Sequence, residues 1–233
     1  PGLPALRSPR RALTQRHRPH SDYSGAMKKP TAPSGSAALA RPRHPQGSPA
    51  HEIRIIGGQW KRTRLRVPDR PGLRPTPDRV RETLFNWLGQ DLTGWRCIDA
   101  FAGTGVLGFE AASRGATWVA MAETDAALVA QLQATRTRLD AAAVHIQRGD
   151  GLMALARVAP GSMELVLLDP PFDSNLFDKA LAAAALAVAT GGFVYLEAPQ
   201  AWTDERLQPL GLALHRHLKA GAVHAHLLVK PSA

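Results

Sequence analysis

Residues 97–105 read Cys97-Ile-Asp-Ala-Phe-Ala-Gly-Thr-Gly105, and an amphipathic stretch, residues 106–113, follows them directly. An apolar start, a glycine-rich turn and an amphipathic stretch predict a strand, a tight turn and a helix. Gly103 and Gly105 allow the backbone to bend sharply and to come close to a ligand. Because ligands bind at the carboxyl ends of strands in open α/β sheets, this stretch predicts a nucleotide-like binding site at one sheet edge.

The same alternation of strand and helix patterns continues to the end of the chain. Repeated strand–helix units favour a Rossmann-like α/β fold, in which a mostly parallel sheet carries helices on both faces. The last two strand-like runs, joined through Gly221, are too close in sequence to be parallel and predict an antiparallel hairpin. The predicted strands are residues 96–100, 118–122, 144–148, 165–168, 193–197, 212–218 and 223–230, and the predicted helices are residues 106–114, 125–139, 151–157 and 175–189.

A smaller structured segment precedes the sheet. A strand over residues 53–56, two glycines and a return strand over residues 60–67 predict a small hairpin. The string Arg74-Pro-Thr-Pro-Asp78 predicts the start of a helix, with Thr76 as the N-cap because its hydroxyl can accept from a first-turn N–H group.

The net charge of +10 is distributed unevenly along the 233 residues. Residues 1–51 carry nine Lys or Arg against one acid and are rich in proline, which predicts a disordered basic tail. Residues 52–81 carry nine against three, and residues 82–233 carry eleven against fifteen. We therefore predict three parts: the tail, a basic hairpin and helix over residues 52–90, and an α/β core over residues 91–233.

Cysteine content and hydropathy limit the class of protein. A single cysteine, Cys97, excludes an internal disulfide framework and fits a reducing compartment. No apolar run approaches the roughly 18 residues that a membrane span requires, and the apolar region of a secretory signal is missing. Met27 is an alternative start site, which would leave the residues before it outside the natural protein. These features predict a cytoplasmic protein.

The acidic residues around the glycine turn indicate which cofactor it binds. Glu123 ends the strand after the turn, where a carboxylate can accept hydrogen bonds from two ribose hydroxyls, and Asp150 ends the next strand, where an adenine edge would lie. The chain has no Walker-type phosphate loop, and no Lys or Arg close to the turn for a pyrophosphate. S-adenosylmethionine, which carries two positive charges and no phosphate, therefore fits better than NAD. The predicted cofactor-binding residues are Asp99, Phe101, Gly103, Gly105, Glu123 and Asp150.

A second string, Asp169-Pro-Pro-Phe172, lies at the tip of the strand predicted over residues 165–168. The carboxylate of Asp169 and a backbone carbonyl can accept hydrogen bonds from an exocyclic amine and hold it in line with a sulfonium methyl. Pro170 and Pro171 stiffen the turn and remove competing N–H donors. Phe172 can stack on a base that has been extruded from a helix. These four residues form the predicted catalytic group.

Four strings of this chain closely resemble the bacterial RsmD family of 16S ribosomal RNA guanine-N2 methyltransferases. The glycine string and Asp-Pro-Pro-Phe occur broadly in class I amino-methyltransferases, whereas the two upstream strings are far more specific to the family. The resemblance covers about residues 52–230 and implies a seven-stranded class I sheet, S-adenosylmethionine as methyl donor and a guanine of small-subunit RNA as target. The strings are Ile53-Arg-Ile-Ile-Gly-Gly-Gln-Trp60, Leu73-Arg-Pro-Thr-Pro-Asp-Arg-Val-Arg-Glu-Thr-Leu-Phe-Asn-Trp87, Asp99-Ala-Phe-Ala-Gly-Thr-Gly105 and Asp169-Pro-Pro-Phe172.

The basic segment independently favours an RNA substrate, because lysines and arginines contact phosphates and position RNA without reading its sequence. We expect a monomer that acts on 16S RNA within a small-subunit particle. Near the C-terminus, His215 with His217 and His224 with His226 would each share a strand face and could mimic a metal cluster, but we expect exposed hairpin residues and no metal site. The predicted RNA-binding residues are Arg54, Lys61, Arg62, Arg64, Arg74, Arg79 and Arg81.

Two other functions remain open at this point. Asp-Pro-Pro-Phe alone also fits methylation of adenine N6 in DNA or of glutamine N5 in protein, and the upstream Arg-Pro-Thr string is what distinguishes them. A non-catalytic RNA-binding assembly factor with a methyltransferase fold is the second alternative. Loss of Asp169 or Gly103 would favour that alternative, and both residues are present.

Overall fold

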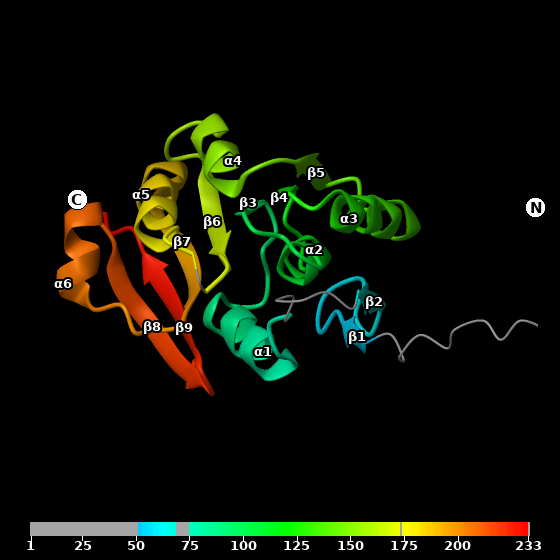
Figure 1. The fold of residues 1–233 in the computed structure, drawn as a ribbon, viewed down its shortest axis with the longest axis horizontal. Helices are drawn as coiled ribbons and strands as arrows, with labels where there is room; N and C mark the ends of the chain where they lie inside the picture. The colour runs from blue at the N-terminus through cyan, green and yellow to red at the C-terminus, as the bar shows by residue number, and fades with distance from the viewer. Residues whose placement is uncertain (1–50, 69–74, 173, 233) are drawn as a thin grey trace, which may run out of the picture. The chain divides into compact units, whose positions relative to one another are not determined.

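The computed structural model describes residues 51–68, 75–172 and 174–232. The predicted disordered tail, apart from its last residue, and the predicted RNA-binding residue Arg74 lie outside the described residues. In chain order (Figure 1) the elements are β1 His51–Arg54, β2 Arg64–Val67, α1 Asp78–Trp87, β3 Arg96–Asp99, α2 Val106–Ser113, β4 Trp118–Glu123, α3 Ala126–Arg138, β5 Val144–Arg148, α4 Gly151–Arg157, β6 Met163–Leu168, α5 Phe177–Ala187, β7 Val188–Ala198, α6 Asp204–Leu207, the 3₁₀ turn Gln208–Leu210, β8 Ala213–Ala220 and β9 Val223–Val229.

The predicted sheet is confirmed, with seven strands in the order β5-β4-β3-β6-β7-β9-β8. The pairs from β5 through β7 are parallel. The pairs β7–β9 and β9–β8 are antiparallel, and the short link through Gly221 requires this of β9–β8. The chain runs outward from β3 to β5 and then returns to place β6 on the other side of β3. This reversal creates a topological switch point between β3 and β6, which is where open α/β sheets bind ligands.

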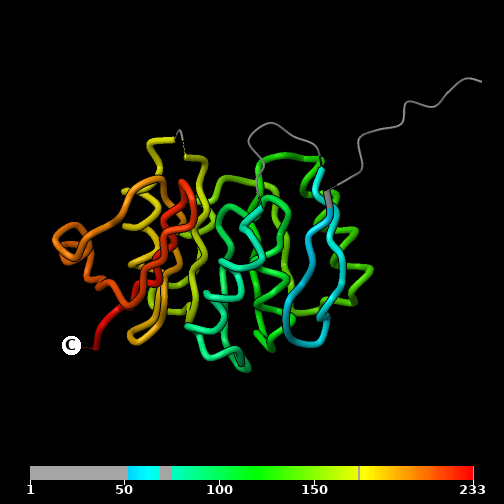
Figure 2. Tube along the Cα trace, turned by 90° about the horizontal axis from the view of Figure 1, so that it is seen from below, coloured from blue at the N-terminus to red at the C-terminus, as the bar shows by residue number. Residues whose placement is uncertain are grey.

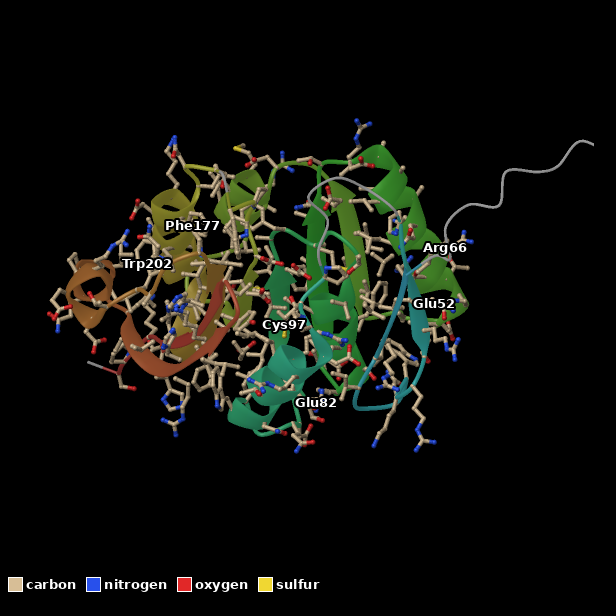
Figure 3. The ribbon with its side chains drawn as sticks, turned by 60° about the horizontal axis from the view of Figure 1, so that its bottom comes forward. Glu52, Arg66, Glu82, Cys97, Phe177 and Trp202 are labelled. Atoms are coloured by element: carbon tan, nitrogen blue, oxygen red, sulfur yellow. The ribbon has the colours of Figure 1, made fainter. Side chains whose placement is uncertain are left out.

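Helices cover both faces of the sheet, and each face buries its own apolar cluster. One cluster joins β1, α1, α2 and α3 to one face, and the other joins α4, α5 and α6 to the opposite face. The central strands are apolar along nearly their whole length because both of their faces are covered. Cys97, on β3, lies inside this core and is fully buried (Figure 3).

The small N-terminal hairpin of β1 and β2 lies beside α2 and α3, at the opposite end of the sheet from the C-terminal hairpin (Figure 2). Its first strand has the predicted length but lies two residues earlier, and its return strand is shorter than predicted because residues 57–62 form a turn, with Arg62 at a φ of +72°. The side-chain amide of Gln131 donates to the carbonyl of Arg66, and Arg138 donates to the carbonyl of Arg64 at 2.9 Å. Side chains of α3 therefore hold β2 through its backbone carbonyl groups.

Two glycines of the hairpin string have a packing role. A Cβ atom on Gly58, whose φ is +71°, would lie 1.8 Å from the carbonyl oxygen of Ser113, and one on Gly57 would lie 2.3 Å from the guanidinium of Arg114. Ser113 also donates its hydroxyl to the carbonyl of Gly57 at 2.6 Å and accepts from the N–H of Trp60 at 2.9 Å. The glycine pair lets the hairpin backbone lie directly on the end of α2.

The predicted N-cap of α1 is wrong. The helix begins at Asp78 after Pro77, and no side chain caps its first turn. The hydroxyl of Thr76 instead donates to the carboxylate of Glu197 at 2.5 Å, 121 residues further along the chain. Burial of both groups favours this contact, because a buried carboxylate needs a donor more than a partly exposed helix end does.

Across residues 51–68, 75–172 and 174–232, no helix has the length and apolar character needed to span a membrane.

Candidate active site

The C-terminal ends of five adjacent parallel strands each carry a carboxylate. Four of these residues were predicted from the sequence as site residues, and Glu197 was missed. The signal that could have found Glu197 is the one used for the others, an acid at the end of a predicted strand. In the order of the strands across the sheet, the residues are Asp150, Glu123, Asp99, Asp169 and Glu197.

The glycine turn between β3 and α2 has the predicted backbone geometry. Gly103 and Gly105 have φ values of +51° and +77°, and a Cβ atom on Gly105 would lie 2.3 Å from the side chain of Leu132. Asp99 is buried, and its Oδ2 accepts from the N–H of Gly108 at 3.1 Å. Burial raises the pKa of Asp99 to about 7, although hydrogen bonds from the backbone of Gly108 and Phe101 oppose the shift. Asp99 thus ties the start of α2 to the end of β3.

Glu123 is brought directly against the glycine turn, as the predicted cofactor site requires. Its Oε2 accepts from the N–H of Gly103 at 2.9 Å, and its Oε1 accepts from the N–H of Asp125 at 2.8 Å. A carboxylate has about four lone-pair sites, so these bonds orient Glu123 while leaving acceptor capacity on a half-buried side chain.

The loop after β5 approaches the same turn. Asp150 caps α4 by accepting from the N–H of Met153 at 3.0 Å. A Cβ atom on Gly151 would lie 2.1 Å from the carbonyl oxygen of Ala100 and 3.1 Å from the ring of Phe101. Gly151 is therefore a candidate site residue that was not predicted from the sequence, since only glycine allows α4 to begin this close to the turn.

The Asp-Pro-Pro-Phe turn follows β6, next to the glycine turn on β3. Ser174 closes it, because both its N–H (3.0 Å) and its hydroxyl (2.5 Å) donate to the carbonyl of Pro171. Pro170 is buried, whereas Phe172 is 39% exposed and lies 6.5 Å from the ring of Phe177. The turn thus presents an aromatic ring at the surface beside a carboxylate.

Asp169 and Glu197 lie next to each other across two strands, because Leu168 of β6 pairs in register with Leu196 of β7. Burial, followed by the negative charges of Glu197 and Asp99, raises the pKa of Asp169 well above its usual range. Burial also raises the pKa of Glu197. Adjacent carboxylates with raised pKa values at a strand edge are typical of an active site.

Comparison with known proteins agrees with this geometry. A family model described as Conserved hypothetical protein 95, the RsmD family, matches residues 53–229. Ribosomal RNA small subunit methyltransferase D of Escherichia coli K12 is 38% identical over 78% of this chain and 91% of its own length. The chain belongs to the RsmD family. The enzyme of the same name from Haemophilus influenzae is 36% identical over 71% of this chain and 92% of its own length.

Solved structures support the RsmD assignment. A putative methyltransferase from Escherichia coli superposes with a TM-score of 0.66 at 32% identity and covers 78% of this chain and 100% of its own. A putative methylase from Haemophilus influenzae gives a TM-score of 0.64 at 30% identity, with the same coverage. The chain therefore has the class I methyltransferase fold and is a methyltransferase of this family.

A buried acid, Glu110 of α2, contacts the RsmD-specific N-terminal strings from the core. Its carboxylate accepts from the N–H groups of Ile56 (2.8 Å) and Gly57 (2.7 Å). The guanidinium groups of Arg114 and Arg81 lie 2.8 and 3.5 Å from it. Glu110 thus accepts hydrogen bonds from two backbone N–H groups and lies close to two positively charged side chains.

One predicted RNA-binding residue is corrected by the structure. Arg81 is fully buried, and its guanidinium donates to the carbonyl groups of Thr76 (3.1 Å) and Arg54 (2.9 Å) and to the carboxylate of Asp78 (2.6 Å). A solvated basic position was predicted because sequence does not show that Glu110 lies opposite. Arg81 holds α1 to the hairpin instead of facing a partner.

The other predicted cations in the described residues are exposed. Arg54 and Arg64 keep 68% and 76% of their side chains accessible, and their ion pairs with Asp78 and Glu52 lie at the surface. Glu52 and Arg66 lie on the outside of the hairpin (Figure 3). The exposed members of the predicted set are Arg54, Lys61, Arg62, Arg64 and Arg79.

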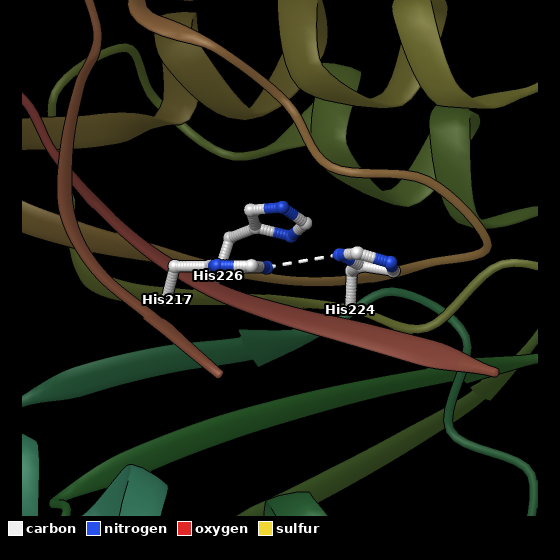
Figure 4. A group of neighbouring side chains, drawn as sticks. All are labelled: His217, His224 and His226. Atoms are coloured by element: carbon white, nitrogen blue, oxygen red, sulfur yellow. Dashed lines mark hydrogen bonds between the residues drawn. The ribbon is translucent and has the colours of Figure 1, made fainter. Parts of the chain in front are cut away.

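The C-terminal histidines are not all exposed, which corrects another expectation. His217, His224 and His226 lie side by side, with 3.0 Å between Nε2 of His217 and Nδ1 of His224 (Figure 4). A bulge between Leu214 and Arg216 breaks the strand alternation, so that His215 packs against Phe193 instead. The predicted sharing of one strand face by His215 and His217 fails for this reason.

His226 is fully buried, and both of its ring nitrogens already have partners. The N–H of Trp202 donates to Nε2 at 3.0 Å, so Nδ1 carries the proton and faces the carbonyl oxygen of Leu196 at 3.3 Å. Burial lowers the pKa of His226 to about 4. These bonds make His226 a neutral structural residue of the hairpin, without a lone pair to offer a metal ion.

Proposed function

We propose that this protein transfers a methyl group from S-adenosylmethionine to the exocyclic N2 amine of a guanine in 16S ribosomal RNA. The observation that carries the proposal is the juxtaposition, at the switch point between β3 and β6, of the glycine turn and the Asp169–Phe172 turn. The first turn suits a nucleoside-like cofactor, and the second suits a planar amine.

The residues of the glycine turn fit S-adenosylmethionine. When bound, this cofactor supplies an electrophilic methyl group on a positively charged sulfur. Glu123 is oriented to accept from ribose hydroxyls, and Phe101 and Asp150 lie on the two loops that would border the adenine. The carboxylates along the strand ends complement a cationic ligand, and a pyrophosphate would be repelled by them.

The Asp-Pro-Pro-Phe turn fits the substrate amine. The carboxylate and backbone carbonyl of Asp169 can accept the amine N–H groups and favour the positive charge that develops on nitrogen. The exposed ring of Phe172 is available to stack on the base, and Ser174 keeps the turn closed. A base within a helix must be extruded to reach this position.

The choice of substrate rests on the family. Relatives at 36–38% identity carry the name ribosomal RNA small subunit methyltransferase D, and their similarity extends over the N-terminal strings as well as the core. The exposed cations of the hairpin supply phosphate contacts for RNA. The family similarity also favours a cytoplasmic enzyme that acts on a small-subunit particle, which we propose together with a monomeric state.

The experiment is mass spectrometry of 16S RNA nucleosides from a strain lacking the gene and from the same strain complemented with it. We expect N2-methylguanosine to fall by one methyl group per 16S RNA in the deletion and to return on complementation. An unchanged nucleoside content would contradict the proposal. Methyl transfer by the purified protein to DNA adenine or protein glutamine, and not to RNA, would support the alternative substrates instead.

Cofactor binding can be tested separately from the substrate. Glu123→Ala removes the acceptor of the ribose hydroxyls and should weaken S-adenosylmethionine binding by about 1.5–3 kcal/mol, the range for hydrogen bonds to a charged group. Isothermal calorimetry on the folded variant measures it, with Glu205→Ala on α6 as the control. Unchanged affinity would remove Glu123 from the cofactor site.

A further inference from the structure

Glu197 is a buried carboxylate that carries an unusual set of partners. Its Oε1 accepts from the hydroxyl of Thr76 at 2.5 Å and from the hydroxyl of Tyr195 at 2.9 Å. The exposed fractions of Glu197, Thr76 and Tyr195 are 3%, 2% and 0%. Two hydroxyl donors on one buried oxygen fix the position of the carboxylate and stabilise its charged form.

The carboxylate of Glu197 lies beside that of Asp169. Leu168 pairs with Leu196, so Asp169 and Glu197 occupy the next positions on the parallel strands β6 and β7. The charged groups that act on this pair are Asp99 from β3 and Arg81 from α1. From β9, His226 pairs with Leu196 and therefore lies on the opposite face of the sheet from Glu197.

We propose that Glu197 is a positioning residue for methyl transfer: held by Thr76 and Tyr195 beside Asp169, its carboxylate makes Asp169 the acceptor of the proton that the substrate amine releases. This inference rests on the proposed function. Asp169 remains the catalytic residue, and Glu197 acts only through it.

The proton balance shows why Asp169 needs such a neighbour. The amine forms the new N–C bond with its lone pair while the bond between that carbon and the sulfonium sulfur breaks and leaves its electron pair on sulfur. One proton then has to leave the nitrogen, and it moves to a carboxylate oxygen of Asp169 and later to water. An ordinary aspartate is a weak base, and a negative neighbour strengthens its hold on a proton.

Hydrogen bonding decides which of the two carboxylates takes the proton. Thr76, Tyr195 and the positive charge of Arg81 all favour the ionised form of Glu197 and oppose the effect of its burial. The charges acting on Asp169 are the negative ones of Glu197 and Asp99, and together with burial they raise its pKa well above the usual range. These contacts therefore favour Asp169, and not Glu197, as the acceptor of the proton that the amine releases.

Thr76 also connects the active site to the RsmD-specific part of the chain. It lies two residues before the start of α1, and its carbonyl accepts from the buried guanidinium of Arg81 at 3.1 Å. The same threonine therefore joins the N-terminal segment to Glu197, and through Glu197 to the catalytic turn.

Two measurements on the full chain test the proposal. The first follows the carboxyl carbon of Asp169 by NMR during a pH titration without substrate, assigned with Asp169→Asn. The second measures single-turnover methyl transfer to undermethylated small-subunit particles across pH. The variants are Glu197→Gln and Thr76→Val, with Thr76→Ser as the conservative rescue and Glu205→Gln on α6 as the matched exposed control.

In Glu197→Gln we expect Asp169 to titrate at lower pH, because the negative neighbour is gone. The rising limb of the rate profile should move to lower pH with it, and the plateau rate should fall by about tenfold as the base becomes weaker. Thr76→Val should lower the rate by about threefold or more because the hydroxyl donor is removed, and Thr76→Ser should restore it. Glu205→Gln should match the wild type.

Superimposable titrations of Asp169 in the wild type and in folded Glu197→Gln would overturn the proposal, whatever the substrate. A moved titration with an unmoved rate profile would also overturn it, because Asp169 would then not be the proton acceptor. If Asp169 titrates at lower pH in Glu197→Gln while the wild-type protein fails to methylate 16S RNA, the role of Glu197 toward Asp169 is supported. Only the proposed substrate is then contradicted.

Discussion

Glu110 on α2 and the adjacent pair Asp169 and Glu197 at the ends of β6 and β7 are carboxylates in different surroundings. Glu110 is fully buried with two backbone donors and two guanidinium groups around it, all within 3.5 Å. At the other group, Asp169 lies beside Glu197 and is acted on by the negative charges of Glu197 and Asp99. A buried charge with partners holds parts of a fold together, whereas adjacent buried acids oppose folding and are retained where chemistry uses them.

The largest effect on stability is expected at Glu110. Glu110→Gln leaves the buried guanidinium group of Arg114 without its counter-charge and leaves Arg81 with Asp78 alone, and we expect it to lower the free energy of unfolding by about 3–5 kcal/mol. Urea unfolding at neutral pH measures this change, with Glu205→Gln as the exposed control. A decrease below about 1 kcal/mol would mean that Glu110 does not fasten the N-terminal segment.

At the pair of Asp169 and Glu197, the main loss should be in the rate of methyl transfer. Asp169→Ala removes the acceptor for the substrate amine, and we expect single-turnover methyl transfer to fall at least ~100-fold, about 2.7 kcal/mol, while the affinity for S-adenosylmethionine stays close to that of the wild type. Asp178→Ala on α5, an exposed position, serves as the control. Near-normal turnover by the variant would remove Asp169 from the reaction.

The third substitution, Asp99→Asn, should stabilise the protein. The folded protein holds the pKa of Asp99 at about 7, above its unfolded value, so the stability linked to this group is present at low pH and lost as pH rises from about 4 to 7. Asp99→Asn keeps an acceptor for Gly108 without the charge, and we expect it to stabilise the protein by about 2 kcal/mol above pH 7.

The pH dependence is the diagnostic feature of that variant. Its gain over the wild type should shrink towards zero as the pH falls to about 4, since Asp99 is then protonated in both states. Denaturant unfolding at several pH values measures the difference in stability between the variant and the wild type. The contributions of Asp169, Glu197 and His226 to the pH dependence are common to both proteins and cancel in this difference. A constant or negative difference would show that Asp99 is held as a structural carboxylate, like Glu110.

The smallest effect is expected where charges face solvent. The pair Arg62→Ala and Arg64→Ala should weaken RNA binding by about threefold and flatten its log–log salt dependence by about 0.7 for each phosphate that the variant no longer neutralises, with cofactor affinity unchanged. The pair Arg157→Ala and Lys179→Ala, on α4 and α5, removes the same amount of exposed charge elsewhere.

The tail is the competing source of RNA affinity. We expect deletion of residues 1–50 to leave methylation of the ribosomal substrate intact, since the family similarity begins at residue 53. Loss of activity on this deletion, together with wild-type behaviour of the paired arginine variant, would place the RNA-binding surface on the tail and not on the hairpin.

Local sequence patterns were sufficient to predict the sheet and most of the candidate site. The strands around Asp99, Glu123 and Asp169 are short apolar runs ending in an acid, and parallel strands bring such ends to one edge whatever their detailed packing. The positive φ of Gly103 and Gly105 follows from the turn that a strand–helix junction of this length needs. These features depend on neighbours a few residues away.

The roles of Thr76, Arg81 and His226 depend on partners that are distant in sequence, and only the folded chain shows them. From the sequence, Thr76 is a candidate helix cap and Arg81 a candidate surface cation. In the folded chain, Thr76 donates to the buried carboxylate of Glu197, and Arg81 lies beside the buried carboxylate of Glu110. His226 is buried because Trp202 and Leu196 enclose its ring nitrogens. A polar side chain takes the partner that best compensates its loss of water, and tertiary packing decides which partner that is.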